Sequence, residues 1–461
     1  MSNQGFGRAP FRGEGENQKA ARQPAGGAHG SSPGRAFGLV RVAVLGGLFL
    51  GFASRAADNP PALSPESYAV DLREAQKAVD AGQGEAALRL LKKQIPTGGA
   101  PDLRGFEWRY LWRRAQGQAS RPGGTNQVER DRMSGLVVRN FDSRMFILAD
   151  NRTLVAATAQ RSLKLFDLTT LEPVQDIVAA REALHLTTNG ISLLTFGEGG
   201  LQTWDTRVKA LAPMWIFPRG GDWSVSAFSP ADWIAAVRFS SGQIQILDVG
   251  ASSANKEIAS FPAHTATIRA LAFSPDGQTL ASAGMDKTVK LWDWAQQRCT
   301  ATFTQHTGTV VSLAFSPDGK RLASAGADKI ILLWDMASKQ LAAQCTGHQY
   351  TVWSLAFAPD GRSLASGSGD DTVRLWSMPA GLEVATFNVS EGTESQPERT
   401  LLQRILAPDG GARAARGVAK ITFSPDGSVL AARLADGTLR VWRASTAKEL
   451  AASDAGLASP R

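Results

Sequence analysis

The chain has 461 residues, of which 43% are hydrophobic and 20% are charged. This composition excludes a wholly disordered protein and a polytopic membrane protein, and the length suits roughly two to four ordinary domains or one array of repeats. Most of the formal net charge of +8 lies near the N-terminus, because residues 1–57 contain seven basic and two acidic side chains. The remainder lacks the clustered Lys and Arg of a nucleic-acid groove, so we expect no nucleic-acid partner.

Residues 1–57 are predicted to be a targeting segment. Residues 1–37 are rich in Gly, Arg, Pro, Ser and Gln, a composition typical of disorder. Arg41 precedes an apolar run at residues 42–53, which is short for a membrane span of about 20 residues. Small residues favour a signal peptide cleaved after Ala56; the alternatives are an uncleaved membrane anchor and a buried helix. Both leading hypotheses make the protein exported or membrane-anchored, with its bulk outside the cytoplasm, periplasmic or in the cell envelope.

Residues 64–117 are predicted to form a helical neck. Ser64 is a candidate N-cap with Pro65 at the first helical position, and apolar residues then recur at helical spacing. Glycines at residues 82–84 separate the first helix from a second one, which Pro96 ends.

A third helix is predicted over Asp102–Gly117. It places Trp108 and Trp112 on one stripe, and Arg113 and Arg114 are expected near its C-terminus, where cations are favourable. Two interpretations of the tryptophans stay open: they form a docking element for a partner, or they pack the neck onto the rest of the protein.

Three segments of the C-terminal half align without gaps at a period of 42 residues. They are LASAGMDKTVKLWD, LASAGADKIILLWD and LASGSGDDTVRLWS, which begin at Leu280, Leu322 and Leu364. A Phe-Ser-Pro-Asp-Gly or Phe-Ala-Pro-Asp-Gly turn precedes each of them at the same offset. These repeats resemble the WD40 (Trp-Asp) repeat family, in which four strands form each blade of a β-propeller.

The resemblance implies an all-β propeller fold, and the repeat frame predicts seven blades over residues 134–443, with six or eight as alternatives. The frame also predicts an insertion at residues 388–416 and a flexible tail at residues 444–461. Because an open row of sheets leaves unpaired edges, residues 135–140 are predicted to pair with Thr438–Trp442 and close the ring. The third strands of the units are predicted to end at Phe166-Asp167, Trp204-Asp205, Leu247-Asp248, Trp292-Asp293, Trp334-Asp335, Trp376-Ser377 and Trp442-Arg443.

The neck carries a second resemblance. Its segment DLRGFEWRYLW, residues 102–112, is similar to one found upstream of the propeller in bacterial envelope-associated WD-repeat proteins, and its first helix pair resembles a tetratricopeptide unit. One such unit is too short for a peptide groove.

A Ser, a His and an Asp recur in each of the three strong repeats, as in a hydrolytic triad. A triad needs one copy with an exposed Ser, whereas each set here is repeated and is followed by a Trp. In the family these positions form a buried hydrogen-bonded chain, so the resemblance implies a structural role. The sets are His264, Ser282, Asp286 and Trp292; His306, Ser324, Asp328 and Trp334; and His348, Ser366, Asp370 and Trp376.

The family also implies a partner-binding face near the loops that enter the first strand of each blade. The candidate contact residues are Arg269, Val311 and Trp353, with Glu182 at the corresponding place in the second unit. For Trp353, the alternative to a contact role is a position in the hydrophobic core.

We interpret the chain as a non-catalytic protein- or peptide-binding scaffold of an envelope or signalling complex, with no cofactor. Two alternatives stay open: a sensor or accessory subunit of an envelope complex, and a propeller-type hydrolase or lactonase with a site in the central channel. The sequence contains no HExxH, no GxSxG, no phosphate-binding glycine loop and no histidine cluster with metal-ligand spacing, so no metal site is expected. Cys299 and Cys345 make no CxxC motif.

Overall fold

The computed structural model describes residues 64–96, 102–119, 132–133, a series of segments between 145 and 248, 256–389, 417–435, 439–446 and Glu449. The predictions for residues 1–57, for residues 135–140 and for nearly all of the insertion and the C-terminal tail lie outside these residues. Within them the protein is mostly β, with three helices. None of the described helices is long and apolar enough to cross a membrane.

The neck contains α1 (Pro65–Asp80), α2 (Gly84–Lys92) and α3 (Phe106–Ala119). The sequence starts α1 as expected, because the Ser64 side chain accepts a hydrogen bond from the Ser67 backbone N–H and Pro65 occupies the first turn. Leu72, Ala75 and Val79 face the interior of the neck, and all three are buried.

The third helix begins and ends later than predicted. Asp102 does not start it, because its carboxylate accepts from the Arg104 backbone N–H at 3.0 Å and holds a turn ahead of Phe106. The helix then runs to Ala119, so Arg113 and Arg114 lie in its interior and not in its last turn.

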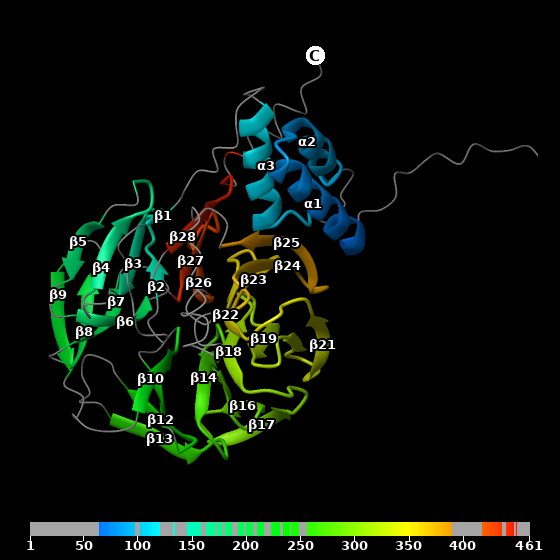
Figure 1. Ribbon diagram of the computed structural model, residues 1–461. Coiled ribbons are helices and arrows are strands. Elements are labelled where there is room, and N and C mark those ends of the chain that lie inside the picture. Colours follow the sequence, from blue (N-terminus) through cyan, green and yellow to red (C-terminus); the bar gives the residue numbers. More distant parts are fainter. Residues whose placement is uncertain are drawn as a thin grey trace, which may run out of the picture. The chain divides into compact units, whose positions relative to one another are not determined.

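Seven four-stranded antiparallel sheets are present among the described residues, and each is called a blade here (Figure 1). Blades one to three contain β2 (Met145–Ile147), β3 (Thr153–Ala157), β4 (Leu163–Asp167) and β5 (Pro173–Ile177); β6 (Ala180–Leu186), β7 (Ser192–Gly197), β8 (Gly200–Asp205) and β9 (Ala210–Trp215); and β10 (Trp223–Phe228), β11 (Ile234–Phe239), β12 (Gln243–Asp248) and β13 (Lys256–Pro262).

Blades four to six contain the three strong repeats. Their strands are β14 (Ile268–Phe273), β15 (Thr279–Gly284), β16 (Val289–Asp293) and β17 (Arg298–Phe303); β18 (Val310–Phe315), β19 (Arg321–Gly326), β20 (Ile331–Asp335) and β21 (Gln340–Cys345); and β22 (Val352–Phe357), β23 (Ser363–Ser368), β24 (Thr372–Ser377) and β25 (Leu382–Asn388). Blade seven combines β26 (Val418–Phe423), β27 (Val429–Leu434) and β28 (Leu439–Arg443) with β1 (Arg132–Met133).

The third strand of every blade ends at the residue pair that the repeat frame predicted, from Asp167 in β4 to Arg443 in β28. The first strands are the inner ones: β2, β6, β10, β14, β18, β22 and β26 each contact the next, and β26 contacts β2. The blades therefore form a closed ring, as the propeller prediction requires.

The chain closes this ring through blade seven. Strand β1 pairs antiparallel with β28, with Arg132 opposite Arg440 and Met133 opposite Leu439. The described pairing residues therefore lie just ahead of residues 135–140, the segment for which the sequence predicted this pairing. A strand from the N-terminal side completes a sheet whose other strands come from the C-terminal side, and both edges of an open array are avoided.

The two ends of each inner strand differ in sequence and are named accordingly. The turn end carries the Pro-Asp-Gly turns, in which Ser274 Oγ accepts from the Thr279 N–H at 2.9 Å and Gly277 adopts a φ of +72°. The histidine end carries the loop that precedes the inner strand, such as that of His306, and the loop after the second strand, such as that of Asp328.

We predict that deleting residues 132–140 lowers the melting temperature by at least about 5 °C, because blade seven loses its fourth strand and the ring opens. Circular dichroism on the full chain measures this effect. The control Arg298→Ala changes an exposed side chain of β17, and its melting temperature stays at the wild-type value. A deletion variant as stable as the wild type would show that β1 does not hold the ring closed.

Candidate functional site

The structure places the four residues of each predicted set in one hydrogen-bonded chain at the histidine end. In blade five, His306 Nδ1 lies 2.6 Å from Asp328 Oδ2 and His306 Nε2 lies 2.7 Å from Ser324 Oγ, which accepts from Trp334 Nε1 at 2.8 Å. In blade four the same three distances are 2.9, 2.6 and 2.8 Å, and in blade six they are 2.9, 2.7 and 2.8 Å.

The burial and electrostatics of these sets are those of a structural hydrogen-bonded chain. Ser282, Ser324 and Ser366 are 0% exposed, so their hydroxyls are not positioned to attack a substrate. Burial lowers the pKa of His264 and keeps its ring neutral, against the opposing effect of Asp286. The carboxylate of Asp370 is partly buried, but hydrogen bonds from His348 and Thr372 hold its pKa well below the usual range.

Blade five departs from its neighbours at one position. The hydroxyls of Thr288 and Thr372 donate to Asp286 Oδ1 and Asp370 Oδ1 at 2.9 and 2.6 Å. The equivalent residue of blade five is Ile330, and Asp328 Oδ1 is buried without a hydrogen-bond partner. An unsatisfied buried oxygen costs stability, so this set is the weakest of the three by this criterion.

The predicted contact residues start the inner strands at the histidine end. Arg269 is exposed, Val311 is half-buried and Trp353 is 37% exposed, so Trp353 is not a core residue. Glu182 lies in β6, and its side chain is outside the described part of the protein.

Sequence reasoning missed a second exposed aromatic residue on this face. Tyr350 is 45% exposed, and a side chain placed on Gly369 would meet Trp353 Nε1 and Tyr350 Cβ, each at 3.4 Å. Both aromatic residues therefore flank Gly369. The repeat alignment contained a signal for Tyr350, because the other two strong repeats have a small residue at its position. These residues are Ala266 in blade four and Gly308 in blade five.

The residues that flank the insertion lie beside the same aromatic pair. The Val389 N–H donates to the Asp371 carbonyl at 3.0 Å, and a Cβ on Gly417 would lie 2.7 Å from the Gly369 Cα. The chain thus leaves blade six and enters blade seven next to Gly369.

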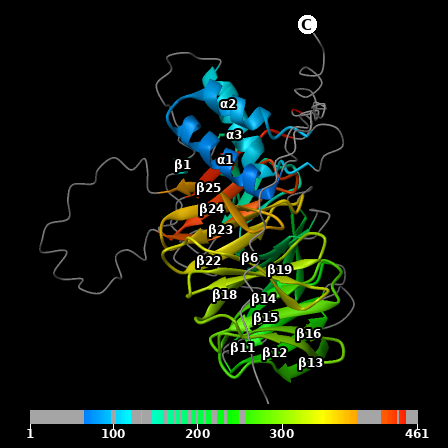
Figure 2. The ribbon, with the colours of Figure 1, turned by 90° about the vertical axis from the view of Figure 1, so that its right-hand side faces the viewer.

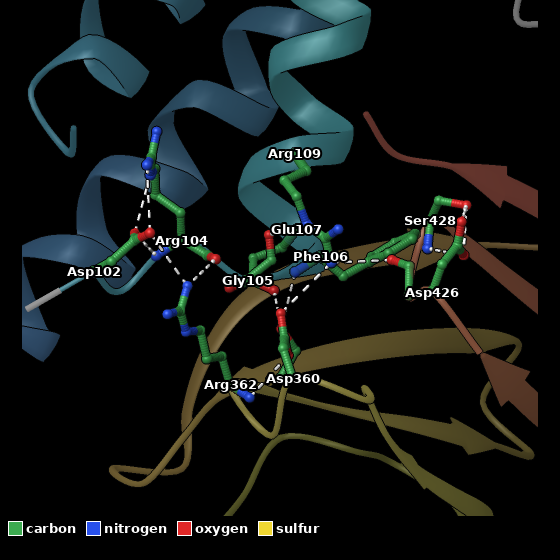
Figure 3. Close-up of polar contacts among 12 residues, drawn as sticks. Asp102, Arg104, Gly105, Phe106, Glu107, Arg109, Asp360, Arg362, Asp426 and Ser428 are labelled. Atoms are coloured by element: carbon green, nitrogen blue, oxygen red, sulfur yellow. Dashed lines mark hydrogen bonds and ion pairs between the residues drawn. The ribbon is translucent and has the colours of Figure 1, made fainter. Parts of the chain in front are cut away.

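The neck lies beside blade six, where α1 contacts the outer strand β25 (Figure 2), and α3 contacts the turn end of blades six and seven. Arg109 donates to the Gly427 carbonyl at 3.0 Å and lies 3.5 Å from Asp360. Arg362 of blade six reaches back to the Asp102 carboxylate and to the Arg104 carbonyl, each at 3.3 Å (Figure 3). These contacts bind the start of α3 to two neighbouring turns.

Apolar contacts reinforce this junction through residues other than the predicted tryptophans. Phe106 packs edge-on against Phe423, and Tyr110 packs edge-on against Phe387, with ring centres 5.3 and 5.1 Å apart. Trp108 instead stacks on Trp112 and donates to the Leu91 carbonyl at 3.0 Å. The two tryptophans are buried and hold the helices of the neck together, so neither is available to a partner.

A buried carboxylate lies at the centre of the junction. Glu107 is 0% exposed, and its oxygens accept from the hydroxyls of Tyr68 at 2.9 Å and Ser363 at 2.5 Å. Burial raises the pKa of Glu107 to about 7, although both hydroxyl donors favour the ionised form. Gly105 leaves room for this cluster, because a Cβ there would lie 2.2 Å from Ser363 Oγ.

Metal ligation is not indicated in the described part of the chain, where no group of three or more His, Cys, Asp or Glu side chains converges. Cys299 is exposed, Cys345 is buried, and both are free thiols.

Comparison with known proteins agrees with the repeat frame. The family model described as "WD domain, G-beta repeat" matches residues 255–293, 297–335, 339–377 and 411–443. A chain in the solved structure titled "Crystal Structure of Mitotic Checkpoint Complex" is 19% identical, and the match covers 67% of this chain and 92% of that chain with a TM-score of 0.53. This likeness concerns the fold alone. No curated protein matches the chain.

We predict that Ile330→Thr raises the free energy of unfolding by about 1 kcal/mol, because the new hydroxyl donates to Asp328 Oδ1 and this gain exceeds the lost apolar contact. Urea unfolding measures it. Ile330→Val removes apolar area without adding a donor and should be slightly destabilising. Equal destabilisation by both substitutions would contradict the assignment of an unsatisfied oxygen.

We predict that Gly105→Ala costs roughly 2 kcal/mol of stability, because the added methyl group overpacks the Glu107 cluster. The matched control is Gly117→Ala within α3, where an added Cβ meets nothing within 4 Å. This control should stabilise the protein slightly through helix propensity. Urea unfolding measures the stability of both variants. A Gly105→Ala variant as stable as the wild type would mean that the junction is loosely packed.

Proposed function

We propose that this chain, which belongs to the WD-repeat family, is a non-catalytic scaffold that binds a protein or peptide partner at the histidine end of blades four to six. The observation that carries the proposal is the exposure of Trp353 beside Tyr350 at the histidine end of blade six, with Met285 exposed at the same end of blade four. Trp, Tyr and Arg are the residue types that supply most of the binding energy at protein interfaces. Arg269 occupies the position of Trp353 in blade four and adds a cation to the same face.

The neck supports this choice of face. It contacts the turn end of blades six and seven through Arg109, Glu107 and Asp102, and Trp353 lies at the other end of the inner strand of blade six. A partner bound at the histidine end and a second component bound to the neck can then be held by one chain. This arrangement suits the finer hypothesis of an envelope or signalling complex, and it is equally compatible with an accessory subunit.

The proposal includes a location outside the cytoplasm. Its support is the sequence of the N-terminal 57 residues, with an apolar run at residues 42–53 that follows Arg41. The exposed face would then meet partners of the cell envelope.

We predict that Trp353→Ala weakens binding of the partner at least about tenfold, because a Trp at the centre of an interface contributes on the order of 2 kcal/mol. The partner is first identified by cross-linking the wild-type protein in its native cells, and its dissociation constant is then measured by calorimetry with each purified variant. The control Ile258→Ala removes another large exposed apolar side chain, 43% exposed on the outer strand β13, and should leave the affinity unchanged.

Equal affinities for the wild type and Trp353→Ala would exclude this face as the binding site. Turnover of a small ester or lactone by the purified protein would instead support the hydrolase hypothesis.

A further inference from the structure

Glu107 connects three parts of the protein that are distant in sequence. Its side chain lies on α3 and accepts from Tyr68 on α1 and from Ser363 at the start of β23. The same two hydroxyls accept from the backbone of the α3 N-terminus, since the Gly105 N–H lies 3.2 Å from Tyr68 Oη and the Phe106 N–H lies 3.1 Å from Ser363 Oγ. The carboxyl group therefore completes a closed set of hydrogen bonds between neck and blade six.

The hydrogen-bond geometry of this cluster favours the ionised form of Glu107, whereas the burial of the side chain favours its protonated form. Each hydroxyl accepts a hydrogen bond from a backbone N–H and donates its proton to Glu107, so this arrangement fits an ionised carboxylate. A fully buried anion, however, has lost its hydration, which is the larger effect and raises the pKa of Glu107 to about 7. Burial also raises the pKa of Tyr68 far above its usual range, so its hydroxyl remains a donor near neutral pH.

Other charged groups lie around this cluster at the start of α3 and on the turn of blade six. They are Asp102 and Arg104 ahead of α3, Arg109 on α3, and Asp360 and Arg362 on the turn of blade six. Asp360 acts on Glu107 by repulsion and raises its pKa further. Asp102 is held ionised, because hydrogen bonds from Arg104 lower its pKa despite partial burial. Near neutral pH, Glu107 is thus the carboxyl group of this junction whose charge is expected to change with pH.

We propose that the contact between neck and propeller is a proton-responsive joint, in which protonation of Glu107 tightens the docking of α3 on blade six and ionisation loosens it. Undocking exposes the carboxyl group to water, where its pKa returns to the ordinary value of about 4.5. The docked state therefore binds a proton more tightly than the undocked state. Docking is strongest at pH values below the undocked pKa and weakens as the pH rises through the docked pKa.

The size of this effect follows from the two pKa values. Between pH 5.5 and 8.5 the equilibrium constant for docking should fall roughly 30-fold, with most of the change complete by pH 7.5. The inference concerns the neck alone and does not depend on which partner occupies the histidine end.

Hydrogen exchange of the full-length protein tests the joint. Amide protection of α3 is measured by mass spectrometry at pH 5.5, 7 and 8.5, after correction for the intrinsic exchange rate at each pH, and strands β19 and β20 of blade five serve as the internal reference. We expect the protection of α3 to fall roughly 30-fold over this range while that of the reference strands stays constant.

Three variants separate the proton effect from simple loss of contacts. Glu107→Gln keeps the size of the side chain and removes its titration, so protection of α3 should become independent of pH. Asp102→Asn weakens the same junction, but the pKa of this carboxyl group is below the tested range, so the fold-change of the wild type should persist. Tyr68→Phe deletes a donor to the ionised form, so the midpoint of the transition should move to higher pH.

Constant protection of α3 in the wild type would overturn the proposal, as would a pH dependence that survives in Glu107→Gln. If Glu107→Gln does not fold, Tyr68→Phe decides: a midpoint that stays in place or moves to lower pH rules the joint out.

Discussion

A buried polar group must find a hydrogen-bond partner, and this constraint holds the protein together at both ends of its inner strands. At the histidine end, His306, Ser324 and Trp334 satisfy one another and are joined to the loop of Asp328. At the turn end, Glu107, Tyr68 and Ser363 do the same for the contact between neck and blade six. Each chain joins loops or helices to the strands of a blade, so both sets determine how loops and helices sit on the blades.

The blades differ in how they meet this constraint. Blades four to six have a Ser in the second strand, whereas blade one has Ala156 and blade seven has Ala432 at that position. Both alanines are buried, so these blades are stabilised there by apolar packing without a polar chain. The propeller thus combines polar and apolar solutions at equivalent positions, which explains why only part of the repeat pattern is visible in the sequence.

The parts of the fold that depend on local sequence were predictable. The end of every third strand followed from the repeat frame, and the start of α1 followed from Ser64 and Pro65. The predicted start of α3 was wrong, because Asp102 binds Arg104 in a local turn that was not recognised. Asp102 also binds Arg362 of blade six, a pairing that no local pattern encodes. The role of Trp108 was ambiguous for the same reason, and the burial of Glu107 depends on Ser363, which is 256 residues away.

The contact between α1 and the outer strand of blade six has a consequence for assembly. Gln76 uses its side-chain amide as a substitute peptide group: its oxygen accepts from the Thr386 N–H at 3.0 Å, and its nitrogen donates to the Thr386 carbonyl. The outer edge of β25 is therefore capped, and another polypeptide cannot extend that sheet by strand addition. The corresponding outer strands β17 and β21 carry mostly exposed side chains, so they offer edges for strand addition that β25 does not.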